Sequence, residues 1–142
     1  MFPINPTLMD MNNWSVGTLP GFLGIEIMEI DPKRLLSQLK IRPEHLAPNG
    51  YLHAGTIVTL ADTSAGYATI ANRPSGAENF TTIELKTNFL GTMREGLLRC
   101  EAKLVHGGRT TQVWDVTVTN AENERAIALF RCTQMILYPQ AK

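Results

Sequence analysis

The sequence predicts an α+β fold in which a long antiparallel sheet wraps around one central helix. Residues 54–72 read AGTIVTLADTSAGYATIAN, a helix-length run whose only formally charged side chain is Asp62. A surface helix carries charged residues on its wet face, so this helix is expected to be enclosed on all sides. The other long runs are strand-like, and a long antiparallel sheet needs one face covered. A single apolar helix lying across that face would cover it.

Residues 1–20 are predicted to form a helical extension in front of this fold. Within it, residues 6–15 (PTLMDMNNWS) suit a short amphipathic helix opened by Pro6 and Thr7. Three side chains of this helix are available for burial: Leu8, Met11 and Trp14. The expected role of the helix is to pack over an open edge of the core.

A β-hairpin and a loop are predicted between the extension and the central helix. Residues 22–30 alternate apolar and acidic side chains over IEIMEI, which is typical of a half-buried strand. DPKR turns the chain, and residues 35–43 (LLSQLKIRP) return as the second strand. The loop at 44–55 is punctuated by proline, asparagine and glycine, and it leads into the helix.

The chain after the helix is predicted to form an antiparallel meander. The turn residues NRPSGAEN end the helix, and strand-like runs follow at residues 80–90, 97–107, 110–120 and 125–138. The Gly107-Gly108 step and the NAEN step are connections of hairpin length. The whole chain, residues 1–142, is therefore expected to form one domain.

Composition sets further limits on the function. The chain has 142 residues, of which 44% are hydrophobic, enough for one domain with a sizeable core. Lysine plus arginine and aspartate plus glutamate number 13 each, so no charge excess favours nucleic acid or an anionic membrane as a partner. The start lacks a basic stretch followed by an apolar run, and no window offers about 18 apolar residues in a row. We expect a cytoplasmic protein with no membrane partner.

Cysteine, histidine and serine usage excludes several kinds of site. Cys100 and Cys132 lie in strand-like runs without metal-binding spacing, so two reduced, buried thiols are expected, with a disulfide or a reactive role as the alternative. The histidines are scattered and nothing near His45 or His106 completes an acid–base pair, so neither a metal nor an organic cofactor is expected. A serine hydrolase is excluded because Ser64, the one serine of the helix, is not in a GxSxG motif.

Asp62 is the first candidate for the chemistry. A carboxylate in an enclosed helix loses much of its hydration, which costs several kcal/mol unless a partner compensates it. A lone buried aspartate is therefore rarely without a role. The alternative is structural, with the carboxylate capping a loop or binding threonine and backbone groups across a dimer interface.

The start of the same helix offers a second element of chemistry. The first backbone N–H groups of a helix lack intrahelical partners and the helix dipole is positive there, so a substrate oxyanion is stabilised at His53, Ala54 and Gly55. Ala54 and Gly55 keep side chains out of the way. Asp62 lies eight residues beyond Ala54, about 12 Å along the axis. One helix cannot place both groups on the same carbonyl carbon, so the spacing predicts a site shared between two copies.

The string NGYLHAGTIVTLADTSAGYA resembles the signature of the PaaI-like hotdog-fold acyl-CoA thioesterases, HGG followed by LAD or LxE before a small-residue helix. The resemblance covers about residues 20–138. It implies a hotdog fold that hydrolyses an acyl- or aryl-CoA thioester to a free acid and CoA, without a cofactor. It also implies a homodimer that shares the active site, and a homotetramer is common in the family. The hotdog fold also carries dehydratases and non-catalytic members, and fold alone does not determine function.

The resemblance assigns catalytic roles to four residues. Asp62 corresponds to the catalytic carboxylate, acting as a nucleophile or as general base for water, and His53 corresponds to the motif histidine near the thioester. Ala54 stands where the family usually has a glycine whose N–H polarises the thioester carbonyl. This replacement is tolerable where φ is negative, because only the N–H is needed. Thr82 corresponds to the serine or threonine that positions the attacking water in some members.

The remaining assignments concern substrate binding. Arg109 and Thr110 resemble the segment that lies along the CoA pantetheine or phosphates. The position six before His53 is often asparagine or glutamine in the family and is Ala47 here, and Asn49 is the candidate to substitute for it. Contacts with the acyl group are expected from Tyr67, Phe89 and Met93.

Two other functions stay open from the sequence. A non-catalytic acyl-CoA-binding hotdog protein would keep the pocket without turnover, and Ala47 is the feature that motivates this alternative. An enoyl-CoA hydratase or dehydratase on the same fold usually resembles a different helix motif with histidine as the base. The LAD signature argues against this second alternative.

Overall fold

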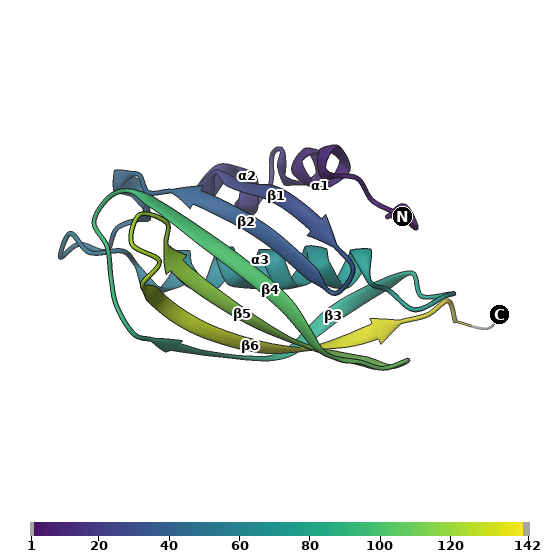
Figure 1. The fold of residues 1–142 in the computed structure, drawn as a ribbon. Helices are drawn as coiled ribbons and strands as arrows, with labels where there is room; N and C mark the ends of the chain where they lie inside the picture. The colour runs from purple at the N-terminus through teal and green to yellow at the C-terminus, as the bar shows by residue number, and fades with distance from the viewer. Residues whose placement is uncertain (1, 141–142) are drawn as a thin grey trace.

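Helix α3 (Ala54–Ala71) is the element around which the chain is arranged in the computed structural model, which describes residues 2–140 (Figure 1). The helix begins and ends where its apolar run predicts. Most of its surface is buried, and its fully enclosed side chains include Leu60, Ala61, Ser64, Ala65 and Ala68. The predicted enclosure is therefore correct for the face that packs on the sheet but wrong for one side of the helix, where Asp62, Thr63 and Tyr67 are partly exposed.

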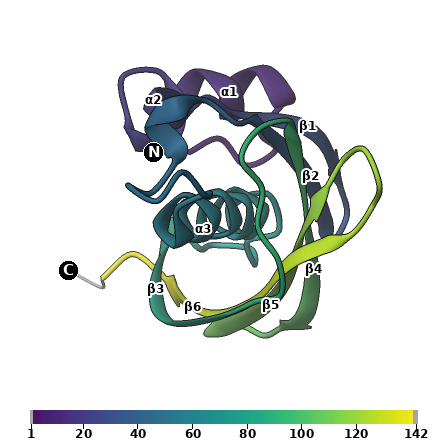
Figure 2. The same cartoon turned by 90° about the vertical axis from the view of Figure 1, so that its left-hand side faces the viewer.

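Six antiparallel strands form one sheet, which wraps around α3 as the predicted hotdog fold requires (Figure 2). The strands are β1 (Ile25–Asp31), β2 (Arg34–Lys40), β3 (Asn79–Phe89), β4 (Leu97–Gly107), β5 (Thr111–Asn120) and β6 (Ala126–Leu137). Their order across the sheet is β1-β2-β4-β5-β6-β3. In β2 and β5 every second side chain is buried, because one face of the sheet packs on the helix.

The predicted meander is correct for β4, β5 and β6 but wrong for β3. Strand β3 pairs with β6 at the far edge of the sheet, and β4 pairs instead with β2. The reason lies in the connection at residues 90–96. Its backbone accepts hydrogen bonds from Leu52 N–H through the Met93 carbonyl and from Ile41 N–H through the Gly96 carbonyl. These bonds hold the connection against the loop before α3 and against the end of β2, so β4 begins beside β2 and not beside β3.

The N-terminal extension contains two helices, α1 (Leu8–Ser15) and α2 (Leu19–Leu23), and a short 3-10 helix η1 (Pro43–His45) follows β2. Thr7 caps α1 in a reciprocal capping box with Asp10. Met11 is buried as predicted, and Trp14 packs against the core, but Leu8 is 40% exposed, so its predicted burial is wrong.

Strand β1 begins later than predicted because α2 occupies the start of the expected strand. Pro20 stands in the first turn of α2, and Gly24 ends it with φ at 76°. The Asn12 side chain then joins α1 to the sheet, since it accepts from Ile27 N–H at 2.9 Å and donates to the Ile27 carbonyl at 3.0 Å. The extension therefore covers the β1 edge of the sheet.

Both cysteines are free and buried, as expected. Burial raises the pKa of the Cys100 thiol to about 11, and its Sγ lies 3.4 Å from Ser64 Oγ. Between residues 2 and 140 we find no helix with the length and apolar character needed to cross a bilayer.

Candidate active site

Asp62 lies midway along α3, on a stripe of partly exposed side chains that also includes Thr59, Thr63 and Tyr67. None of the ion pairs within residues 2–140 includes this carboxylate. Its Oδ1 atom is buried and has no hydrogen-bond partner in the same part of the chain. Burial therefore raises the pKa of Asp62 above its ordinary value of 3.8, because the charged form is poorly solvated.

The carboxylate also lies close to β6. Burial and, as a second cause, the negative charge of Asp62 raise the pKa of Cys132 to about 12. A thiol so hard to ionise remains protonated at neutral pH, so Cys132 is not a competing nucleophile. Asp62 is the ionisable group that faces solvent at this position of the fold.

A cleft of about 310 Å³ opens beside Asp62. Three parts of the chain border it: α3 itself, the start of β3 through Asn79 and Phe80, and the N-terminal segment through Phe2 and Pro20. This is the side of α3 between the N-terminal extension and β3 that no strand covers in Figure 2. The structure thus joins a poorly solvated carboxylate to a largely apolar cleft, the usual composition of a small-molecule site.

The lining of the cleft agrees only partly with the predicted acyl contacts. Tyr67 borders the cleft, as expected for such a contact. Phe89 is 47% exposed near the far end of β3, and Met93 packs against the core beyond it, so neither borders this cleft. Phe2 and Phe80 also border the cleft and were not predicted. Their only signal in the sequence is that each is an aromatic residue near the boundary of a predicted element.

His53 caps the start of α3. Its Nδ1 accepts a hydrogen bond from Gly55 N–H at 2.8 Å. A Cβ at position 55 would lie 2.9 Å from that nitrogen, so only glycine permits this cap without a shift. Because Nδ1 accepts this bond, Nε2 is the ring nitrogen that is left to donate a hydrogen bond.

Ala54 is the first residue of α3, and it is exposed. We find no acceptor for its N–H among the hydrogen bonds of residues 2–140. The non-glycine residues with positive φ in this range are Lys33 and Glu124, so alanine replaces glycine at position 54 without backbone strain. The Gly55 N–H is already bound to His53, which leaves the Ala54 N–H as the free donor of the first turn.

The loop before α3 is held by its own polar groups. Asn49 Oδ1 accepts from Tyr51 N–H at 3.1 Å, and Ala47 N–H donates to the Tyr51 carbonyl at 2.7 Å. Asn49 is exposed in this turn. The Arg94 guanidinium lies over the Tyr51 ring, 4.2 Å from its centroid.

His45, to which the sequence assigned no role, supports this junction. The side chain is fully buried, and its Nδ1 accepts from Arg42 N–H at 3.0 Å. The His45 carbonyl accepts from His53 N–H and from Thr56 Oγ1, which ties the loop to the first turn of α3. Burial lowers the pKa of His45, so the ring is neutral and structural.

Arg109 and Thr110 lie at the opposite end of α3, in the turn between β4 and β5. The Arg109 carbonyl accepts from Tyr138 Oη at 2.6 Å, and its guanidinium lies 5.4 Å from the centre of that ring. Arg109 borders a second cleft of about 420 Å³, together with Asn72, which ends α3. The 18 residues of α3 span about 27 Å. Within one chain, the predicted CoA-binding arginine is therefore far from the helix start.

Thr82 lies on β3 with its side chain on the inner face of the sheet, opposite Gln134, next to a β-bulge. It is partly buried and does not border the Asp62 cleft. The bulge between Thr82 and Glu84 changes the side-chain alternation at this point of the edge strand. His106 is exposed near the end of β4, beside the turn that carries Arg109 and Thr110.

Comparison with known proteins identifies the family. The family model described as "Thioesterase superfamily" matches residues 49–127, which include the end of the loop, α3 and strands β3, β4 and β5. The chain is 32% identical over 111 residues to a 1,4-dihydroxy-2-naphthoyl-CoA hydrolase of Listeria monocytogenes, covering 78% of this chain and 89% of the relative. It is 30% identical over 134 residues to the enzyme of the same name from Escherichia coli, covering 92% and 95%.

Solved structures agree with this result. A mutant form of thioesterase PA1618 from Pseudomonas aeruginosa superimposes with a TM-score of 0.87 at 26% identity, covering 93% of this chain and 94% of that one. The chain therefore belongs to the thioesterase superfamily and is a thioester hydrolase with a hotdog fold.

Proposed function

We propose that this chain hydrolyses an acyl- or aryl-CoA thioester to the free acid and CoA, with Asp62 as the catalytic carboxylate. The observation that carries the proposal is the Asp62 carboxylate, which is poorly solvated and unpaired within residues 2–140 and borders an apolar cleft. Two relatives are named as hydrolases of a CoA thioester, which supports CoA as the leaving group. Perturbed carboxylates in clefts are frequent at catalytic sites.

The chemistry requires an activated oxygen and a donor for the oxyanion. Ionised Asp62 either removes a proton from water as the water oxygen attacks the thioester carbon, or attacks that carbon itself to form an anhydride that water then hydrolyses. The Ala54 N–H donates to the developing oxyanion. The C–S bond breaks, and the thiolate leaves and takes up a proton. His53 Nε2–H donates to the substrate and helps to orient it.

The two groups act together when they come from two copies of the chain. Strand β3 is an open edge of 11 residues, with Leu85 and Phe89 of its inner face 42% and 47% exposed. Antiparallel pairing of two β3 edges about a two-fold axis would continue the sheet and set the two α3 helices antiparallel. The start of one α3 then faces the middle of the other. This dimer is the assembly that we propose, with a tetramer as a further step.

Complementation between two inactive variants tests the shared site. Asp62→Asn removes the carboxylate, and Ala54→Pro removes the N–H donor at a first helical position, where proline is tolerated. His53 has φ of −69° and ψ of 135°, the extended conformation that precedes proline readily. Each variant alone is expected to lose activity. A mixture in equal amounts, denatured and refolded together, is expected to regain about a quarter of the wild-type activity, because half of the dimers are mixed and each has one intact site. A site formed within one copy predicts no recovery.

Hydrolysis itself is measured as thiol release with dithionitrobenzoate from benzoyl-, phenylacetyl- and medium-chain acyl-CoAs. Turnover by the unmodified chain supports the proposal. Binding of these compounds without turnover would place the chain among non-catalytic acyl-CoA-binding proteins. Ala47, which stands where the family often has asparagine or glutamine, is the feature that motivates this alternative. Crotonyl-CoA, followed at the enoyl absorbance, detects hydratase activity separately.

A further inference from the structure

The N-terminal segment, residues 2–24, is attached to the helix that carries Asp62 by a row of aromatic rings. The Phe2 ring packs edge-on against Trp14 with ring centres 4.6 Å apart, and Trp14 packs edge-on against Tyr67 of α3 at 5.6 Å. The Tyr67 hydroxyl also shares a hydrogen bond of 3.0 Å with Ser15 Oγ. Edge-to-face pairs of this kind add to the stability that burial supplies.

Polar contacts hold the same segment at its start and in its middle. The Arg73 guanidinium, just beyond α3, donates to the Phe2 and Pro3 carbonyls at 3.1 Å and 2.8 Å. Further along the segment, Asn12 binds the backbone of Ile27 in both directions. The position of Phe2 is therefore set by contacts that precede any ligand.

This attachment makes the segment one wall of the cleft at Asp62. Phe2 and Pro20 line the cleft together with Tyr67 and Phe80. The floor depends on Gly66, since a Cβ there would lie 3.1 Å from Phe80 Cζ. The Phe80 ring thus lies directly against α3, and three aromatic rings border the cleft that the carboxylate enters.

We propose that the N-terminal segment is the specificity element of this enzyme, and that Phe2 selects acyl groups that are planar and aromatic. This inference rests on the proposed function, in which the thioester carbon is attacked at Asp62. The acyl group attached to that carbon enters the continuous apolar cleft. A cavity of about 150 Å³ holds one benzene ring, so a cleft of about 310 Å³ accepts one or two fused rings. Flat rings also match aromatic walls, where offset and edge-on packing is favourable.

The test compares Phe2→Ala with Phe22→Ala in the full chain. Phe22 lies in the same segment, is 71% exposed and does not border the cleft, so it controls for a general loss of aromatic surface. Phe2→Ala is expected to lower kcat/KM for benzoyl-CoA about tenfold, and to change kcat/KM for butyryl-CoA by less than twofold. Phe2→Tyr keeps the ring and is expected to restore the ratio between the two substrates. Phe22→Ala should leave both values unchanged.

Equal effects of Phe2→Ala on both substrates, or the same loss in Phe22→Ala, would overturn the inference. Thermal unfolding of each variant shows whether the segment remains folded. Absence of turnover by the unmodified chain would instead count against the proposed function. In that case, calorimetric Kd values for benzoyl-CoA and butyryl-CoA decide the inference, which requires Phe2→Ala to weaken only the aromatic ligand.

Discussion

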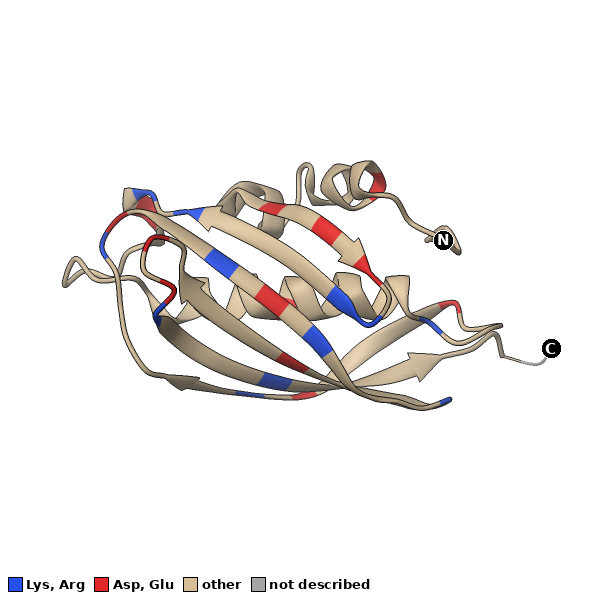
Figure 3. Cartoon of the chain, in the orientation of Figure 1, with Lys and Arg blue, Asp and Glu red and all other residues tan. Residues whose placement is uncertain are grey.

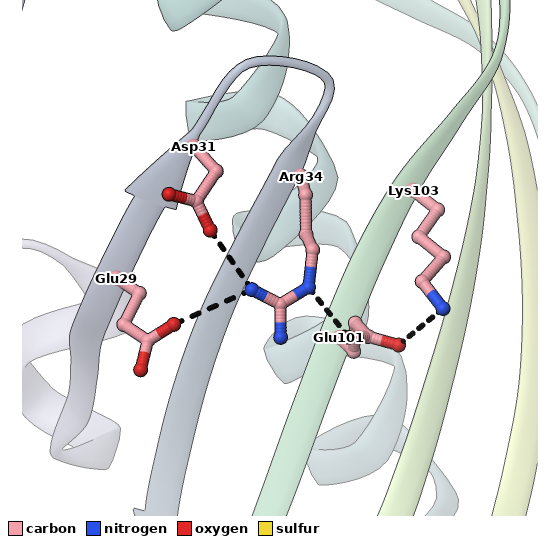
Figure 4. Close-up of polar contacts among 5 residues, drawn as sticks. All are labelled: Glu29, Asp31, Arg34, Glu101 and Lys103. Carbon is pink, nitrogen blue, oxygen red and sulfur yellow. Dashed lines mark hydrogen bonds and ion pairs between the residues drawn. The ribbon is translucent and has the colours of Figure 1, made fainter.

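Glu101 on the outer face of the sheet and Asp62 beneath its inner face are carboxylates of one fold with contrasting surroundings. Charged residues cross the outer face from strand to strand (Figure 3). Glu101 accepts from Arg34 Nε at 2.7 Å and lies 2.8 Å from Lys103 Nζ (Figure 4). Arg34 also binds two carboxylates of the neighbouring strand, and the bond from Lys103 is the largest cause that lowers the pKa of Glu101.

The two carboxylates therefore differ in their surroundings, and the proposed function assigns them different roles. Where the fold uses a carboxylate for stability, it surrounds the group with cations, as it does for Glu101. Asp62 has no such partner within residues 2–140, and burial alone raises its pKa. A group kept in that state costs stability, and under the proposed function the compensating benefit is reactivity toward a substrate.

The largest expected effect is on activity. Asp62→Asn keeps the shape of the side chain but removes its charge, so kcat/KM is expected to fall by about 10²-fold or more. Glu101→Gln makes the same chemical change on the outer face and should leave kcat/KM within about twofold. Thiol release from benzoyl-CoA measures both. Equal losses in the two variants would contradict the division between the faces.

The pH dependence of activity is the next largest effect. In the proposed mechanism only ionised Asp62 accepts a proton or attacks the thioester, and the pKa of Asp62 lies above 3.8. For the unmodified chain, kcat/KM is therefore expected to fall about tenfold per pH unit below that raised pKa. Glu101→Gln should show the same acid limb. If the fall of kcat/KM at low pH moved to another pH in Glu101→Gln, the titrating group would be on the outer face of the sheet.

Composition and local pattern are enough to predict the parts of this fold that depend on short stretches of chain. The uncharged run of α3, the hairpin and the position of Asp62 all follow from residues near one another in sequence. The place of β3 does not, because it depends on which distant strand it pairs with. Its partner β6 is about 40 residues away, and no local signal encodes that choice.

The walls of the site were missed for a similar reason. Phe2 and Phe80 both line the cleft, although 77 residues lie between them in the sequence. Neither residue is part of a recognisable local motif, since Phe2 is near the start of the chain and Phe80 is near the start of β3. The motif that predicts the catalytic residues lies on one helix and its loop, so it can be recognised in the sequence, whereas the cleft is lined by three separate segments.

A smaller effect, on stability, is expected to have opposite signs in the two variants. A raised pKa in the folded state means that the stability contributed by protonated Asp62 is lost as pH rises from 3.8 through the folded value. A lowered pKa means that Glu101 contributes stability at pH values above its ordinary pKa of 4.5, and that this stability is lost as pH falls.

At pH 7, Asp62→Asn should raise the free energy of unfolding by up to about 1 kcal/mol. Glu101→Gln should lower it by less than about 1 kcal/mol, because the ion pairs are partly exposed. Urea unfolding at pH 7 measures both changes.

The smallest expected effect is the response of these stability differences to salt. Raising the ionic strength from about 0.1 M to 1 M shortens the screening length from about 10 Å to about 3 Å. The contribution of Glu101 is an attraction between partly exposed charges, so the difference between Glu101→Gln and the unmodified chain should shrink toward zero. The cost at Asp62 is lost hydration, which dissolved salt does not restore, so the Asp62→Asn difference should persist. Urea unfolding of the three proteins at both salt concentrations separates the two causes. If the difference in the free energy of unfolding between Asp62→Asn and the unmodified chain also vanished at high salt, another charge would have to act on Asp62 from outside residues 2–140 of the same copy. The second copy in the proposed dimer would be the first place to look for that charge.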